Sequence, residues 1–182
     1  LIGDSAEAQF KTYGQQWRSV TKCEKAGLFL FDDGYELGNN MPAVNDCFLE
    51  SVKYHIDRDT NEDVGIHAVQ FLRMDAHNVK LLLDSGHNLL SIYAQQGELL
   101  AIVEYANYED EIYWHNTYMR RNDVTRKLGV GNYAIYQLLK IAHWHKKPLN
   151  LGLGVFDYKK AYNPRMKFGP GISLSNVHSF LC

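Results

Sequence analysis

The sequence predicts an α/β fold in which a mixed, mostly antiparallel sheet is flanked by helices. Apolar side chains recur at helical spacing in several stretches, and three strand-like segments with short turns follow one another in the middle of the chain. A strand–helix–strand succession comes next. Tight turns join antiparallel strands, whereas a crossover helix joins parallel ones, so one sheet is expected to contain both arrangements. The 182 residues are enough to bury one substantial core, and we expect a single domain.

The first half of the chain is expected to be largely helical. Apolar residues from Phe10 to Val20 recur every three or four positions, although Gly14 interrupts them. Pro42 favours the first turn of a second helix. Gly86 would end a third helix, which is either continuous or broken near Asp75. The expected elements are helices at residues 4–22, 42–57 and 65–84 and a strand at 26–32.

The second half is expected to form most of the sheet. Runs of β-branched and aromatic residues, separated by turns around Gly97 and Asp110, predict an antiparallel meander. Ala134 and Leu138 then share one face of a helix, and Pro164 would end a short final helix. The expected elements are strands at 89–94, 98–105, 111–119, 148–155 and 172–180 and helices at 131–145 and 156–162.

Charge is divided unevenly along the chain. Residues 1–119 carry 19 acidic and 8 basic side chains, a net charge of −11, whereas residues 120–182 carry 2 acidic and 11 basic side chains, a net charge of +9. The basic residues of the second part all lie between Arg120 and Lys167. A charge run is usually a solvated face, but this one coincides with a candidate phosphate-binding loop. We therefore expect an anionic ligand, for which CoA, tRNA and DNA all remain open.

Composition also bears on the compartment. No apolar run approaches the roughly 18 residues that a membrane span needs, and no secretory signal is visible, so no membrane partner is expected. Cys23, Cys47 and Cys182 are widely spaced and include no C-x-x-C pair. This pattern argues against a disulfide framework, and a cytoplasmic location is expected.

The segment from Arg126 to Gly131 lies between an expected strand and an expected helix and contains two glycines. Small side chains let the backbone approach a phosphate closely, and a helix N-terminus adds about half a positive charge. A Gly-x-Gly pair alone is more often a tight turn, so the prediction depends on its basic neighbours. The residues predicted to bind a phosphorylated ligand are Arg126, Lys127, Leu128, Gly129, Val130, Gly131 and Asn132.

The spacing Arg-x-x-Gly-x-Gly at a helix mouth resembles the pyrophosphate loop of the GNAT acyltransferase superfamily. Tyr158 opens a Tyr-Lys-x-x-aromatic-x-Pro motif similar to the one that closes the GNAT-type domain of FemAB-like and aminoacyl-tRNA–protein transferases. The resemblance covers about residues 95–168 and does not extend to residues 1–90. It implies a GNAT-like fold and acetyl-CoA or another acyl-CoA as co-substrate, with the pyrophosphate held by Arg126 and the amides of residues 128–131.

Acyl transfer to an amine needs an acceptor for the amine proton, stabilisation of the oxyanion and a proton for the leaving group. In GNAT enzymes a backbone N–H of the strand before the loop donates a hydrogen bond to the thioester oxygen. A tyrosine on a later helix often protonates the thiolate. The resemblance therefore implies that the strand at 111–119 binds the thioester oxygen and that Tyr158 protonates the thiolate. The alternative for Tyr158 is a structural role in the core. Glu104, Glu111 and His115 are candidate general bases, and the last two are expected on one face of their strand.

No metal site is predicted from the spacing of the histidines. His143 and His145 would point about 200° apart on a helix, so they cannot chelate one ion there, and the other histidines show no His-x-x-x-His spacing. No serine or cysteine lies in a nucleophile-elbow sequence, which argues against a covalent acyl-enzyme.

The predicted function is an N-acyltransferase that moves an acyl group from acyl-CoA to an amine on a small molecule or on a nucleic acid, including a nucleobase or tRNA. One alternative is a GNAT-shaped binding module that has lost the chemistry. Another is an aminoacyl-tRNA-dependent transferase. The single copy of the GNAT-like unit favours acyl-CoA as the donor, because peptidyl transferases that use aminoacyl-tRNA normally have two copies.

Overall fold

Five strands form one mixed sheet in the computed structural model, with the order β1-β2-β3-β4-β5. The structure describes residues 5–32, 34–58, 74–152 and 162. The strands are β1 (Phe29–Phe31), β2 (His87–Tyr93), β3 (Leu99–Asn107), β4 (Ile112–Met119) and β5 (Leu149–Asn150). The pairs β1–β2, β2–β3 and β3–β4 are antiparallel, and the pair β4–β5 is parallel. The predicted α/β class and the mostly antiparallel sheet are confirmed.

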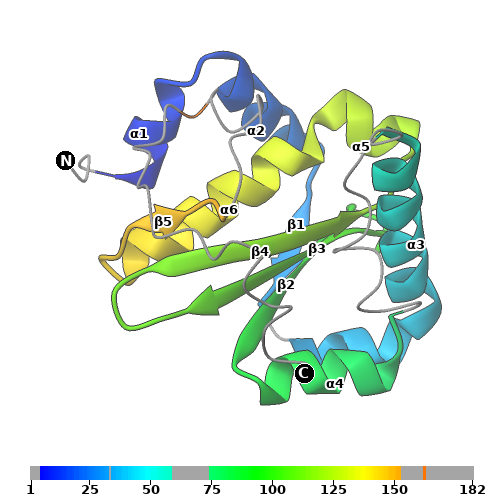
Figure 1. The fold of residues 1–182 in the computed structure, drawn as a ribbon. Helices are drawn as coiled ribbons and strands as arrows, with labels where there is room; N and C mark the ends of the chain where they lie inside the picture. The colour runs from blue at the N-terminus through cyan, green and yellow to red at the C-terminus, as the bar shows by residue number, and fades with distance from the viewer. Residues whose placement is uncertain (1–4, 33, 59–73, 153–161, 163–182) are drawn as a thin grey trace.

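Helices cover both faces of this sheet (Figure 1). One face packs against α6, on which α1 and α2 pack in turn, and the other packs against α3, α4 and the short 3-10 helix η1. The helical elements are α1 (Ala6–Lys11), α2 (Gln15–Lys25), η1 (Gly34–Asn40), α3 (Met41–Arg58), α4 (Ala76–Asp84), α5 (Asp123–Leu128) and α6 (Val130–Trp144). None of the helices within the described ranges is long and apolar enough to cross a membrane.

The central strand β3 explains why the sheet needs cover on both sides. Its residues from Leu99 to Ala106 are all buried, and they are nearly all apolar rather than alternating with polar ones. Val103 belongs to the core beneath α6, whereas Ile102 belongs to the core beneath α3 and α4. Glu104 is the exception, since it is a carboxylate in a strand that is buried on both faces.

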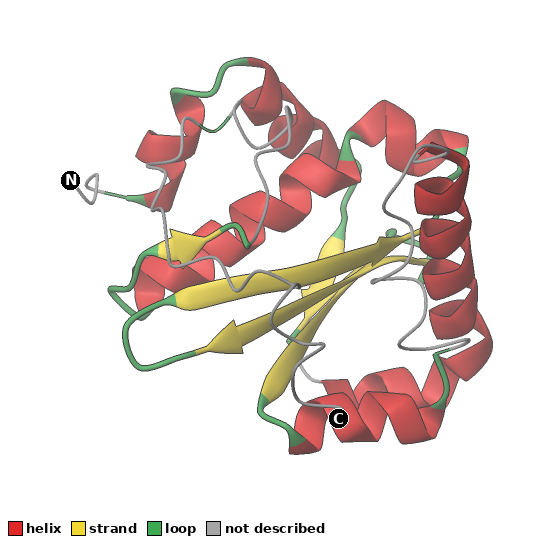
Figure 2. Ribbon diagram, in the orientation of Figure 1, coloured by secondary structure: helices red, strands yellow, loops and turns green. Residues whose placement is uncertain are grey.

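Most predicted elements within the described residues are confirmed, with some differences at their ends. The helix expected at 4–22 is two helices, because Gly14 takes a positive φ of 37° between α1 and α2. Residues 65–73 of the helix expected at 65–84 lie outside the described residues. The described part is α4, which starts after Asp75, whose side chain accepts a hydrogen bond from the Asn78 N–H and caps the helix. The three meander strands and the helix after them are present (Figure 2).

The last part of the predicted architecture is only partly described. The strand expected at 148–155 begins as β5, which has two residues in the described range. Leu151 and Gly152 are described and are not part of a strand, because Gly152 takes a positive φ of 72°. Residues 153–155 and the final strand at 172–180 lie outside the described residues. So does the final helix, apart from Tyr162, which lies in a turn and packs against Phe10 of α1.

Candidate functional site

The predicted phosphate-binding loop is mostly helical, and the expectation of an open loop was wrong. The side chain of Asn122 accepts a hydrogen bond from the Thr125 N–H at 3.0 Å and so caps the helix α5. Arg126 and Lys127 therefore lie in the last turn of α5, where both side chains are exposed. Gly129 alone separates α5 from α6, so Val130, Gly131 and Asn132 already lie in α6.

Gly129 is covered on one side by α2. Its φ of 74° is left-handed, and a Cβ placed on it would lie 2.5 Å from the Ser19 hydroxyl oxygen. The same hydroxyl accepts a hydrogen bond from the Asn132 amide, whose oxygen accepts one from Tyr162. Two residues of the predicted loop, Gly129 and Asn132, thus pack α6 against α2.

Gly131 faces a different direction, towards the end of β4. A Cβ placed there would have the Met119 methyl group at 3.9 Å as its nearest neighbour, which is ordinary van der Waals contact. The first turn of α6 is therefore less crowded at Gly131 than at Gly129. This turn lies beside the carboxyl end of β4, where a helix N-terminus favours an anion.

The structure brings two of the three predicted bases together and keeps the third apart. Glu104 and His115 both belong to one cluster on the face of the sheet that packs against α3 and α4. Glu111 lies before β4, and its carboxylate oxygens accept hydrogen bonds of 3.0 and 3.1 Å from the Asn150 amide. Tyr158, the predicted acid, lies outside the described residues.

A β-bulge in β4 places His115 beside Glu104. The pairing of β3 with β4 shifts between Glu104, which opposes Asn116, and Tyr105, which opposes Trp114, so His115 is the extra residue. As a result Trp114 packs against the core beneath α6, whereas His115 and Asn116 both lie on the face of Glu104. Bulges often re-aim a side chain in this way next to a functional site.

The cluster contains one histidine that the sequence analysis did not select. His87 Nδ1 lies 2.6 Å from Glu104 Oε1, and its ring stacks on that of His115 with 4.4 Å between the ring centroids. We define the His-Glu-His cluster as His87, Glu104 and His115. The expected strand began at residue 89, which left His87 outside it. Beginning the strand at residue 87 puts this side chain on the same face as Leu89, which opposes Glu104.

Hydrogen bonds fix the buried carboxylate of the cluster. Glu104 is only 4% exposed, and its Oε2 accepts hydrogen bonds from the Tyr118 hydroxyl at 2.8 Å and from the Asn116 amide at 3.2 Å. Burial, and then the Glu104 charge, raise the pKa of Tyr118 well above its ordinary value, so Tyr118 remains a donor. The carboxylate is thus held with Oε2 satisfied and Oε1 facing His87.

His115 is the member of the cluster best suited to accept a proton. Burial lowers the pKa of its imidazole below the ordinary value, while the Glu104 charge acts in the opposite direction and His87 adds to the lowering. Its Nε2 is buried and has no hydrogen-bond partner. A neutral imidazole with a free ring nitrogen, close to a carboxylate that would stabilise the protonated form, can act as a general base.

The low pKa of His115 predicts that acid destabilises the fold. Between the ordinary value of 6.5 and the lower value in the fold, the unfolded chain binds more protons, so stability is lost as the pH falls through this window. We expect the melting temperature of the native protein to fall more steeply from about pH 7 to about pH 5 than that of a His115→Gln variant. Identical slopes for the two proteins would contradict this assignment.

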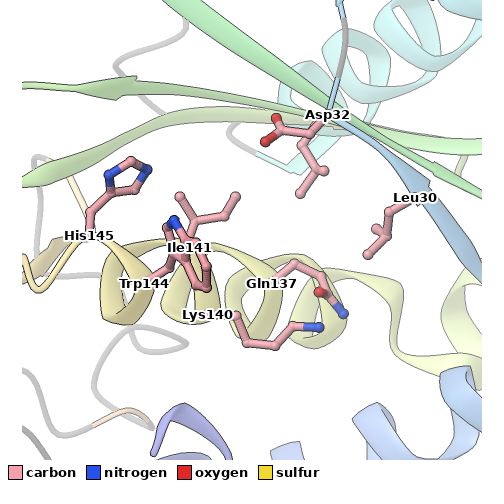
Figure 3. Close-up of a pocket in the computed structure, with 8 residues that line it drawn as sticks. Leu30, Asp32, Gln137, Lys140, Ile141, Trp144 and His145 are labelled. Atoms are coloured by element: carbon pink, nitrogen blue, oxygen red, sulfur yellow. The ribbon is translucent and has the colours of Figure 1, made fainter.

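A second feature is a pocket between the sheet and α6, on the opposite face of the sheet from the His-Glu-His cluster. Its volume is about 500 Å³, and Figure 3 shows residues of β1 and residues of α6 facing each other across it. Asp32 accepts a hydrogen bond from the Tyr105 hydroxyl, and the buried Gln137 has an amide nitrogen without a partner. The lining residues are Leu30, Asp32, Leu90, Gln137, Lys140, Ile141, Trp144 and His145, none of which was predicted to be catalytic or ligand-binding.

The two described cysteines do not supply a nucleophile. Burial raises the pKa of both Cys23 and Cys47 to about 12, which keeps the thiols protonated at neutral pH.

Comparison of the chain with models of known protein families and with curated proteins found no match. The functional argument therefore depends on the geometry of the site.

Proposed function

We propose that the protein is an N-acyltransferase that moves an acyl group from an acyl-CoA to an amine. The observation that carries the proposal is the bulge in β4, the strand that would hold the thioester. This bulge places the neutral imidazole of His115 beside the buried carboxylate of Glu104 on the neighbouring strand β3. The resemblance of the loop and of the Tyr-Lys motif to GNAT enzymes supplies the reaction class.

The donor would lie along the edge of β4 that faces away from β3. The parallel pairing of β4 with β5 consists of two residue pairs, Ile112 with Leu149 and Tyr113 with Asn150. Within the described part of the chain, no strand pairs with β4 from His115 to Met119 on that side. Backbone N–H groups of such an edge can donate to a thioester carbonyl and to the oxyanion that forms from it. The antiparallel meander followed by a parallel crossover is also compatible with the GNAT-like order that the resemblance implies.

The pyrophosphate of the donor would lie at the first turn of α6. Gly131 leaves space at the end of β4, the helix dipole favours negative charge, and Arg126 and Lys127 supply exposed cations in the preceding turn. This assignment narrows the predicted loop, because Gly129 and Asn132 are occupied by contacts with Ser19.

The acceptor amine would approach the partly exposed side chain of His115, whose ring must turn to bring its buried Nε2 to the substrate. As the amine nitrogen attacks the thioester carbon, His115 takes its proton, the C–S bond breaks, and the thiolate of CoA leaves and takes a proton from an acid, the role predicted for Tyr158. Glu104 is too deeply buried to take the proton itself. It acts as a positioning residue whose charge stabilises the protonated imidazole of His115, as in other histidine–carboxylate pairs.

Thermal shift measurements with CoA, acetyl-CoA, longer acyl-CoAs, tRNA and duplex DNA test the donor. A ligand that binds only the native state raises the melting temperature by mass action. At a concentration of 100 times its Kd, it adds about 2.7 kcal/mol to the free energy of unfolding. We expect the shift with an acyl-CoA and its loss in a Gly131→Leu variant, whose side chain would fill the space beside Met119.

The matched control is Gly38→Leu in η1, where a Cβ would have no neighbour within 4 Å. This variant should keep the full shift. Stabilisation by nucleic acid but by no CoA species would contradict an acyl-CoA donor. An acyl-CoA shift in a protein that transfers no acyl group to any amine tested would favour the binding module.

A further inference from the structure

We propose that His87, Glu104 and His115 form a binding site for a divalent transition-metal ion of the zinc class. One ligand atom from each of these residues lies within 4.8 Å of the other two. The three residues come from three neighbouring strands, β2, β3 and β4, so the backbone of the sheet holds them in place. Among the residues that the structure describes, no other such group of three ligands occurs.

The ligand types select the metal. Two imidazoles and one carboxylate are a common donor set for zinc, with a fourth position left open for water or substrate. Mg²⁺ and Ca²⁺ prefer oxygen ligands, so the two ring nitrogens of the cluster disfavour them. A cation bound here would offset the negative charge of a carboxylate that is only 4% exposed.

The surroundings of Glu104 resemble an outer shell around a metal ligand. Tyr118 and Asn116 donate to Oε2, which leaves Oε1 as the atom that faces the cluster. Such outer partners orient a ligating carboxylate. These hydrogen bonds hold the carboxylate, so a metal would bind to a group that needs little reorientation.

His115 provides a second, independent indication. Its Nε2 is buried without a hydrogen-bond partner, which is costly for a polar atom unless something binds to it. A metal ion would be that partner.

Binding requires a small rearrangement of the imidazole rings. A ring nitrogen coordinates a metal in the plane of its ring, whereas the rings of His87 and His115 are stacked with only 19° between their planes. At least one ring must therefore turn about its Cβ–Cγ bond, a torsion with a broad energy profile. Both side chains are only partly buried, which leaves room for this rotation.

Titration of the metal-free protein with Zn²⁺ by calorimetry, and with Co²⁺ by visible absorption, tests the site. We expect one ion per chain and a Co²⁺ spectrum of low coordination number. His87→Ala and His115→Ala should each weaken binding by on the order of 100-fold, and the outer-shell variant Tyr118→Phe by about 10-fold. The control is His77→Ala, an exposed histidine at the start of α4, which should leave binding unchanged.

Binding that survives in His115→Ala, or that is lost in His77→Ala, would overturn the proposal by assigning the ion to other histidines. Failure of the native protein to bind Zn²⁺ would overturn it directly. Circular dichroism checks that each variant folds, and His115→Gln, which keeps a polar side chain at this position, replaces His115→Ala if the latter does not. The proposal does not rest on acyl transfer, because every measurement is made without an acyl donor. A metal held by His115 would occupy the nitrogen that accepts the proton in the proposed reaction, so the role of His115 as a base applies to the metal-free protein.

Discussion

Replacing Gly129 with alanine should lower the free energy of unfolding by about 2 to 4 kcal/mol. Two effects add at this position. A residue with a Cβ costs about 1 to 2 kcal/mol in the left-handed region, where Gly129 has a φ of 74°. The new Cβ would also lie 2.5 Å from the Ser19 hydroxyl oxygen and 2.7 Å from the Ser19 Cβ, so α2 would have to move away from α6. Urea unfolding with an unchanged m-value measures the loss.

The matched control for this prediction is two residues away. Gly131→Ala meets only the Met119 methyl group at 3.9 Å and needs no positive φ, so it should be neutral or stabilise the helix by up to about 1 kcal/mol. Removing the obstacle with Ser19→Gly should recover the part of the Gly129→Ala loss that comes from crowding, but not the part that comes from φ. Equal effects of the two glycine substitutions would contradict the described junction between α5 and α6.

Replacing Glu104 with alanine should cost about 3 kcal/mol or more in the free energy of unfolding. The substitution removes the acceptor for Tyr118, Asn116 and His87 at once and leaves their polar groups buried beside a cavity. Breaking a buried charged network by removing one partner typically costs this much, because the partners cannot recover their water. Chemical unfolding of the purified variant gives the value.

Glu104→Gln separates the hydrogen bonds of the carboxylate from its charge. The amide oxygen can accept from Tyr118 and Asn116, and the amide nitrogen can donate to His87, so we expect a loss of less than about 1 kcal/mol. The same variant lacks the charge that would stabilise a protonated His115 and is a poorer metal ligand. A large loss of stability in both variants would mean that the charge itself, rather than the hydrogen bonds, supports the fold.

The strands and the long helices could be predicted because each has a strong local pattern. The meander follows from aromatic and β-branched runs between turns, and α6 follows from apolar residues such as Ala134 and Leu138 at helical spacing. The short helix α5 was missed because Arg120 to Asp123 looks like a polar link. The signal that could have found it is Asn122, an N-cap residue followed by an acid in the first turn.

The candidate site was predicted only in part, because it is assembled across strands. Glu104 and His115 stood out as polar residues in strands, but their contact depends on a bulge whose position is set by the pairing with β3. His87 lies at the first residue of β2, and element ends are the least certain part of a sequence-based assignment. The spacing of histidines along the chain gave no hint of the His-Glu-His cluster for the same reason.

The extra residue in β4 shifts the alternation of side chains between the two faces of the sheet partway along the strand. Before it, Ile112 and Trp114 turn towards α6; after it, Asn116 and Tyr118 turn the other way, although all four positions are even-numbered. Deleting a single residue here would restore one continuous alternation, and either the aromatic packing under α6 or the partners of Glu104 would be lost. The length of this strand is therefore under as much constraint as its side chains.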